Sequence, residues 1–304
     1  MTTGTHLTAA EMVPSVMVKV LCGLVPAILV QAAWFGTGVL TNIGLAVLFA
    51  WLFEAGALVA QRKPVVSALR DGSVTVTALL LALALPPTIP TAYLAFGVGM
   101  AVLVAKHAYG GLGFNPFNPA MVGYAAVLVS FPAAAAVWPE PSWMQLHSVD
   151  ALTAATALDE ARHLPLALKL GIAPAASTHP DPWVSINGAY LAGGAFIVAV
   201  RAADGLVAAG VLVGLALAGM VAFGGVEGMV FHLGHGAAMA GAFFIATDPV
   251  SAPRERLARG VYALAIGVLT VVIREAGGYP DGLAFAVLLL NAAAPLLDQM
   301  IRAK

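Results

Sequence analysis

Long apolar stretches recur along the chain and predict membrane-spanning helices. A helix needs roughly 20 apolar residues to cross a bilayer, and a broken helix can use fewer. The apolar stretches alternate with short polar or Gly/Pro-rich turns. We therefore expect ten helical segments, the third and eighth of which are short: 16–35, 38–60, 72–86, 91–106, 118–137, 187–203, 205–223, 234–248, 257–274 and 282–300.

The basic residues predict the orientation of these segments. Lys and Arg accumulate in the cytoplasmic loops of membrane proteins. If the N-terminus is cytoplasmic, eleven of the fourteen Lys and Arg fall on the cytoplasmic side, and only Arg162, Lys169 and Arg274 fall outside. We therefore expect an even number of spans, both termini in the cytoplasm, and an outward-facing segment over 138–186.

The two halves of the chain carry similar short segments. The stretch "RDGSVTVTALLLALALPP" (70–87) has a counterpart in "GHGAAMAGAFFIATDPV" (234–250), and both are rich in small residues and end at proline. They lie five expected spans apart, so the repeats would have opposite topology, as in proteins that hold a solute near the midplane. The alternative is that glycines merely permit close helix packing. We expect an all-α membrane protein of two inverted five-helix repeats, 1–137 and 187–304.

Composition supports the membrane class and excludes several others. The chain is 61% hydrophobic and 10% charged, whereas soluble domains carry about 25% charged residues. A net charge of −1 and the lack of a basic tract argue against nucleic-acid binding. The single cysteine, Cys22, excludes disulfides and cysteine-ligated iron–sulfur clusters within this chain. The N-terminal stretch lacks a basic region, so we expect the first apolar segment to remain as a helix.

Four motifs together resemble one family. They occur in the family's order and span more than half of the chain. They are "GGLGFNPFNPAMVGYA" (110–125), "DALTAAT" (150–156), "ATDPVSAP" (246–253) and "GGYPDGLAFAVLLLNAAAPLLD" (277–298). The combination resembles the family formed by the D subunit of the Rnf electron-transport complex and the B subunit of the sodium-translocating NADH:quinone reductase. The short N-terminal region before the first helix favours the Rnf type.

The resemblance implies a covalent cofactor in the outward segment. In this family an FMN is joined through its phosphate to the last threonine of a [Ser/Thr]-Gly/Ala-Ala-Thr motif. Thr153-Ala154-Ala155-Thr156 matches that motif, with Thr in the first position and with the motif's aspartate at Asp150. Thr156 would therefore carry the FMN, with Asp150 and Thr153 beside it. The alternative is that this stretch is only a capped helix on the outer face.

The residues around Thr156 fit such a modification. A threonine hydroxyl is a poor nucleophile and has no adjacent base here, so a separate flavin transferase would have to attach the FMN. An outward segment is accessible to that enzyme. Asp150 can cap the helix that we expect to follow it, and backbone amides at a helix start can hold the remaining phosphate charge.

The resemblance also implies a role and partners. The Rnf complex passes electrons between ferredoxin and NAD and couples this to Na⁺ or H⁺ movement, in the bacterial cytoplasmic membrane. The chain has no NAD-binding Gly-rich loop and no cluster ligands, so iron–sulfur and further flavin subunits would be required as partners. An inverted-repeat channel or secondary transporter without a redox role is the alternative, because fold does not fix function.

Several further polar residues are candidates for binding. Asn115 and Asn118 could hold a second, noncovalent flavin such as riboflavin, or an ion, or they could satisfy backbone groups at a helix break. Ionisable residues at membrane depth are functional candidates by default. The expected ion path therefore comprises the two short segments and the residues Gly72, Gly236, Asp248, Asp281 and Glu54. The alternatives are that Asp248 and Asp281 are interfacial helix caps and that Glu54, facing the bundle interior, is protonated or paired with a Lys or Arg.

Two other residue types have simpler interpretations. The seven histidines do not pair at a common depth, so we do not expect haem. The five tryptophans are typical of the aromatic belts at membrane interfaces.

Overall fold

The structure is a computed structural model that describes most of the chain. The described residues are 9–141, 143, 153–154, 158, 181–222, 225–279 and 281–302.

Helices make up almost all of the first half of the chain. Its elements are α1 (Ala9–Phe35), α2 (Gly38–Ala60), α3 (Val65–Leu69), α4 (Ser73–Ala84), α5 (Thr91–Gly99), the π-helical turn η1 (Met100–Lys106), the 3₁₀ turn η2 (His107–Tyr109), α6 (Pro119–Ser130) and α7 (Pro132–Ala136).

A two-residue β-ladder then precedes the helices of the second half. Its strands are β1 (Trp138–Pro139) and β2 (Thr153–Ala154). The helices that follow are α9 (Pro182–Ala199), α10 (Gly205–Ala222), α11 (Val226–Gly234), α12 (Ala238–Ala240) with the π-helical turn η3 (Gly241–Ile245), α13 (Arg256–Ala276) and α14 (Leu283–Arg302).

Each of the ten expected segments contains a helix, and the all-α membrane class is confirmed. Within the described residues, seven helices are long and apolar enough to cross a membrane, and α11 with α12–η3, bent by 74°, forms a candidate eighth span. The other two expected segments hold the shorter helices α4 and α6. Ten complete spans and the inverted repeat stay predictions.

The expected segment 118–137 differs from the structure in one respect. It is divided at Phe131 into α6 and α7. Pro132 causes the division, because proline has no N–H to donate and its ring disfavours helical geometry at the preceding residue.

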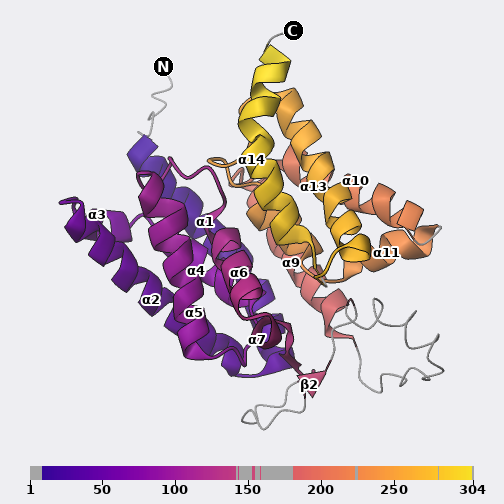
Figure 1. The fold of residues 1–304 in the computed structure, drawn as a ribbon, viewed down its shortest axis with the longest axis horizontal. Coiled ribbons are helices and arrows are strands. Elements are labelled where there is room, and N and C mark those ends of the chain that lie inside the picture. The colour runs from indigo at the N-terminus through magenta and orange to yellow at the C-terminus, as the bar shows by residue number, and fades with distance from the viewer. Residues whose placement is uncertain are drawn as a thin grey trace, which may run out of the picture.

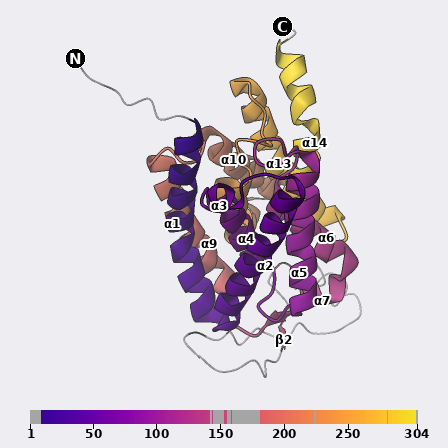
Figure 2. The same ribbon diagram turned by 90° about the vertical axis from the view of Figure 1, so that its left-hand side faces the viewer.

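Figure 1 shows the two halves side by side, with the start of α1 and the end of α14 at one end of the molecule and the β-ladder at the other. The perpendicular view in Figure 2 gives the same arrangement. The halves meet where α1 packs along α9 and where α6 packs against α14. The first contact requires glycine, because a Cβ on Gly193 would lie 1.8 Å from the carbonyl oxygen of Gly23.

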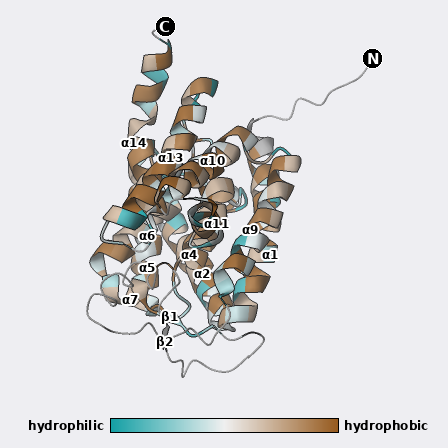
Figure 3. Cartoon of the chain, turned by 90° about the vertical axis from the view of Figure 1, so that its right-hand side faces the viewer, coloured by the Kyte–Doolittle hydropathy of each residue, from teal (hydrophilic) through white to brown (hydrophobic). Residues whose placement is uncertain are grey.

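The outer surface of the helices is apolar, as a lipid-facing surface requires. Exposed large hydrophobic side chains occur on nearly every long helix, including Leu29, Leu52, Val221 and Leu289. Figure 3 shows that apolar residues predominate along the helices. In water such a surface would aggregate, whereas in a bilayer it needs no protein partner.

Candidate functional site

A cavity opens between the two halves, next to the β-ladder. Its volume is about 120 Å³. Rings of Trp138, Trp183, Tyr124 and Tyr190 form part of its wall, and most of the rest is aliphatic. The described polar side chains on the wall, apart from the tyrosines and tryptophans, are Gln31 and Asp281. An apolar, ring-lined cavity with few polar groups suits an aromatic ligand.

The tryptophans around this cavity form a cluster. The ring centroids of Trp138 and Trp183 lie 5.0 Å apart in an edge-on arrangement, and Phe35 contacts both rings. Trp34 donates its indole N–H to the hydroxyl oxygen of Ser185 at 2.7 Å. The sequence could not show that α1, β1 and α9 meet here, and the position of these tryptophans at a membrane interface stays a prediction.

The β-ladder holds one end of the stretch that contains position 156. Ala154 pairs with Trp138, and Thr153 pairs with Pro139. The helix expected to follow Asp150 is thus absent at residues 153–154, where backbone pairing with β1 replaces helical hydrogen bonds. Asp150 and Thr156 themselves lie outside the described residues.

Leu158, four residues after Ala154, contributes to the cavity. Its side chain is 8% exposed and contributes to the cavity wall beside Gly236 and Asp281. Position 156 is therefore two residues from Ala154 on one side and two residues from Leu158 on the other. Nothing in the sequence pattern around Leu158 singled it out.

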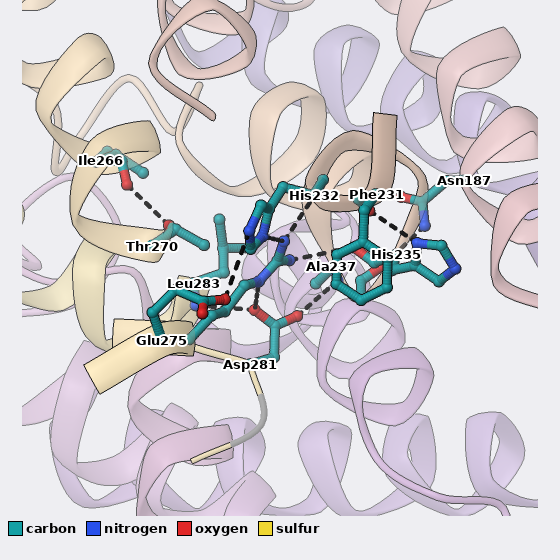
Figure 4. Close-up of polar contacts among 12 residues, drawn as sticks. Asn187, Phe231, His232, His235, Ala237, Ile266, Thr270, Glu275, Asp281 and Leu283 are labelled. Carbon is teal, nitrogen blue, oxygen red and sulfur yellow. Dashed lines mark hydrogen bonds and ion pairs between the residues drawn. The ribbon is translucent and has the colours of Figure 1, made fainter. Parts of the chain in front are cut away.

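The break between α11 and α12 forms the opposite wall and is held by an ion pair (Figure 4). The Arg274 guanidinium donates to the carbonyl oxygens of His232 (2.9 Å) and His235 (3.1 Å), and its Nε lies 3.2 Å from Asp281 Oδ1. Asp281 in turn accepts from the backbone N–H of Ala237 at 2.6 Å. The pair therefore bridges both sides of the break.

The Arg274–Asp281 ion pair forms a clamp whose charges match the two helix ends. The last carbonyl groups of α11 carry partial negative charge, and the cationic guanidinium binds there. The first amides of α12 carry partial positive charge, and the Asp281 carboxylate binds there. From α9, Asn187 donates to the carbonyl oxygens of Gly234 (3.0 Å) and Gly236 (2.9 Å), which satisfies further groups freed by the break.

Gly236 has a specific structural reason to be glycine. Its φ of +62° lies in the left-handed region, which costs other L-residues energy. A Cβ there would lie 2.5 Å from Asp281 Oδ2, 2.6 Å from Leu158 Cδ1 and 2.8 Å from Arg274 Nη2. Gly72, at the start of α4, also has positive φ (+79°).

A second contact fastens the outer segment to the same break. Asp181 is the residue before α9, and its Oδ2 lies 2.5 Å from Nε2 of His235. Its Oδ1 accepts a hydrogen bond from the backbone N–H of Trp183. Burial raises the pKa of Asp181, but these hydrogen bonds outweigh it and leave the pKa below its usual value.

A separate buried ionic cluster lies in the first half. Glu54 of α2 bonds to Lys106 Nζ at 2.8 Å and to His107 Nε2 at 2.8 Å, and all three residues are under 10% exposed. Lys106 also donates to the hydroxyl of Ser73, the first residue of α4, at 3.1 Å. Glu54 therefore faces the bundle interior and is paired with a basic residue of the same half.

The two asparagines of the "NPFNPA" turn bond to backbone groups. Asn118 Oδ1 caps α6 by accepting from the N–H of Met121 at 3.2 Å, and Asn118 Nδ2 contacts the carbonyl oxygen of Ile245. Asn115 donates to the carbonyl oxygen of Phe117. A second flavin at this turn stays a prediction.

The candidate residues thus fall into three places. Asp281 and Gly236 adjoin the cavity, Glu54 lies in the buried ionic cluster near the start of α4, and Asp248 caps a turn by accepting from the N–H of Val250. The basic partners Lys106 and Arg274 were not among the site residues expected from the sequence. One sequence feature could have pointed to them: in each half, a basic residue lies three or four positions before a Gly-Gly pair.

The whole chain matches a known family. A model described as the NQR2, RnfD, RnfE family covers residues 1–304. A protein of Alcanivorax borkumensis, named as the D subunit of an ion-translocating oxidoreductase complex, is 42% identical, over 97% of this chain and 93% of its own length. Proteins of the same name from Ectopseudomonas mendocina and Pseudomonas paraeruginosa are each 40% identical, over 99% of this chain and 93% of theirs. The chain therefore belongs to the NQR2, RnfD, RnfE family.

Proposed function

We propose that the chain is the flavin-carrying membrane subunit of an Rnf-type ion-translocating oxidoreductase complex. Relatives that cover almost the full chain carry the name of one subunit of an ion-translocating oxidoreductase complex. The apolar helix surface provides for membrane insertion, and the other subunits of the complex, including iron–sulfur and further flavin subunits, supply and remove electrons.

The covalent FMN is assigned to Thr156 in this proposal. The single observation that supports it best is the position of the motif, because Leu158, two residues away, contributes to the wall of a ring-lined cavity. Two residues of chain span at most about 7 Å, so a group attached at position 156 can reach this cavity. When bound, FMN supplies transfer of single electrons.

The chain's own residues then have definite tasks. The rings of Trp138 and Trp183 offer faces and edges against which an aromatic ring system packs. The aliphatic wall excludes water, and Gln31 and Asp281 are the polar groups placed to orient a ligand. Thr153 and Asp150, which precede the attachment residue in the motif, are assigned to the surroundings of the attached cofactor, and backbone amides are assigned to the remaining phosphate charge.

Peptide mass spectrometry tests the assignment. Protein made together with its native flavin transferase should yield a peptide covering 150–162 that carries the mass of FMN minus water, with the modification on Thr156. Thr156→Val should lose the yellow-green fluorescence of the denatured protein band, whereas the matched variant Thr153→Val should keep it. An unmodified wild-type peptide would refute the flavin assignment and favour a channel or transporter without a redox role.

The orientation is part of the same proposal. Both termini are assigned to the cytoplasm and the 138–186 segment to the outside of the inner membrane, where the transferase acts. In a Cys22→Ser background, Ser142→Cys should react with a membrane-impermeant maleimide in intact cells, and Arg254→Cys, at an exposed residue of the other end, should not. The reverse pattern would overturn the orientation.

We assign the ion path to the short helices α4 and α12–η3 with Glu54, Asp248 and Asp281. Broken helices expose carbonyl oxygens that can replace part of a cation's hydration shell. Gly72 and Gly236 are poor probes because both have positive φ. Glu54→Gln combined with Lys106→Met removes both buried charges together. Ion uptake that persists in vesicles at the wild-type ratio to electron flow would place the path elsewhere.

A further inference from the structure

Three exposed basic residues gather at the end of α2 and along α3. Arg62 and Lys63 come directly after the last turn of α2, and Arg70 directly follows α3. All three are exposed, and none of them pairs with a carboxylate in the part of the chain that the structure describes. The nearest acid in sequence, Asp71, accepts instead from the backbone N–H of Ser73 at 2.7 Å. Figure 1 shows α3 at the edge of the first half, on the side away from the second half.

Exposed apolar side chains border these cations. Leu52 and Val59, which lie two turns apart on one face of α2, are 58% and 66% exposed. On another side, Lys63 Nζ donates to the carbonyl oxygen of Gly110 at 3.2 Å, which places the 110–114 loop beside the cations. Phe114 of that loop is 71% exposed. We call this surface the α2–α3 corner, and it comprises Arg62, Lys63, Arg70, Leu52, Val59 and Phe114.

Arg62 has a backbone conformation that favours glycine. Its φ is +57°, and the backbone around it closes the end of α2, with the N–H of Lys63 bonded to the carbonyl oxygen of Leu58 at 2.9 Å. Helices that end in this way usually have glycine at the left-handed position, because a side chain there costs free energy. The turn itself therefore gains nothing from arginine, and what Arg62 adds is an exposed cation at the corner.

A phosphate diester that carries acyl chains matches the corner in both charge and polarity. Guanidinium groups bind pairs of phosphate oxygens, and an ammonium group adds a further positive charge. Acyl chains joined to that phosphate would lie along the exposed apolar face of α2, which is continuous with the lipid-facing surface of the bundle. A soluble phosphate compound would leave this apolar face unused.

We propose that the α2–α3 corner binds the headgroup of an anionic phospholipid. The phosphate is held by Arg62 and Lys63, Arg70 adds attraction, and the acyl chains lie along Leu52 and Val59. The proposal requires no flavin and does not depend on the function proposed above.

Native mass spectrometry of the full-length chain in detergent tests this binding directly. The wild type should retain added phosphatidylglycerol in preference to phosphatidylcholine. Arg62→Gly should weaken the apparent affinity for phosphatidylglycerol about fivefold, because it removes one cation that faces an anionic headgroup. Arg62→Lys keeps the charge and should keep most of the affinity. Adding Arg70→Gln to Arg62→Gly should bring the loss to about 25-fold.

Thermal unfolding separates a lipid site from a purely local role of Arg62. In phosphatidylcholine, Arg62→Gly should melt about 2–4 °C above the wild type, because glycine adopts positive φ without strain. The additional stabilisation by phosphatidylglycerol should be smaller in Arg62→Gly than in the wild type. If Arg62 only interacts with the dipole of α2, the substitution changes the melting temperature equally in both lipids, and that result would overturn the proposal.

Three controls exclude other occupants. Arg254→Gln removes an exposed cation before α13 and should leave the affinity for phosphatidylglycerol unchanged, whereas a loss equal to that of Arg62→Gly would indicate general surface charge. Glycerol phosphate should not displace the lipid, and displacement would indicate a soluble phosphate ligand. The assembled complex should still retain the lipid. Absence of the lipid there, together with failed assembly of the Arg62→Gly variant, would assign the corner to a protein partner. Each of these contrary results would overturn the lipid site.

Discussion

Removal of the Arg274 charge should destabilise the protein strongly, because the guanidinium serves three acceptors at once. Arg274→Gln loses the bonds to the carbonyl oxygens of His232 and His235 and leaves Asp281 without its cation. The Arg274 side chain is 1% exposed and that of Asp281 is 18% exposed. Breaking a buried pair by removing one partner costs about 3–5 kcal/mol.

The assay is thermal unfolding of the purified protein in detergent, with a double-mutant cycle. At about 2–4 °C per kcal/mol, Arg274→Gln should lower the melting temperature by roughly 6–20 °C. Asp281→Asn alone should also destabilise, and the double variant should be more stable than additivity predicts by about 1–3 kcal/mol.

An exposed ion pair provides the control for this cycle. Arg302 Nε lies 2.8 Å from Glu255 Oε1, with the two side chains 58% and 40% exposed. Surface pairs contribute about 0–1 kcal/mol, so Arg302→Gln should change the melting temperature little. If Arg274→Gln behaves like Arg302→Gln, or if the double variant is additive, the clamp does not hold the helix break and the reasoning is refuted.

Three further predictions concern packing, the buried cluster and pH. Gly193→Ala should destabilise the protein by about 3 kcal/mol because the added Cβ meets a backbone oxygen. The control Gly188→Ala adds a Cβ that meets no atom within 4 Å, so in thermal unfolding it should be neutral or slightly stabilising. Lys106→Met should cost about 3–5 kcal/mol by removing the lysine cation from the buried Glu54, which keeps only its contact with His107. Glu54→Gln in the same protein should recover part of that loss. Folding lowers the pKa of the Asp181 carboxyl from a reference value of 3.8. The carboxylate therefore stabilises the folded protein above that pH, and this stabilisation is lost as the pH falls through the folded pKa. The stability difference between wild type and Asp181→Asn should accordingly shrink below about pH 4. A difference that grows on acidification would contradict this sign.

The sequence by itself determined the membrane class and the positions of most helices, although α11 (Val226–Gly234) lies before the expected segment 234–248. Apolar stretches are local, and a segment that can satisfy all its backbone groups in a bilayer must be helical. Each of the ten expected segments accordingly contains a helix. Family membership was also readable, because the four motifs lie in order along the chain and the match extends over residues 1–304.

Only the tertiary structure decided what the polar residues do. Glu54 meets Lys106 across 52 positions, and Leu158 meets Gly236 across α9, α10 and α11. Such partnerships follow from helix packing, which depends on close approaches such as that of Gly193 to Gly23, and no local pattern encodes them. The same reason explains why residues 153–154 form a strand: backbone pairing with Trp138–Pro139 outweighs the weak helical preference of a short Thr/Ala stretch.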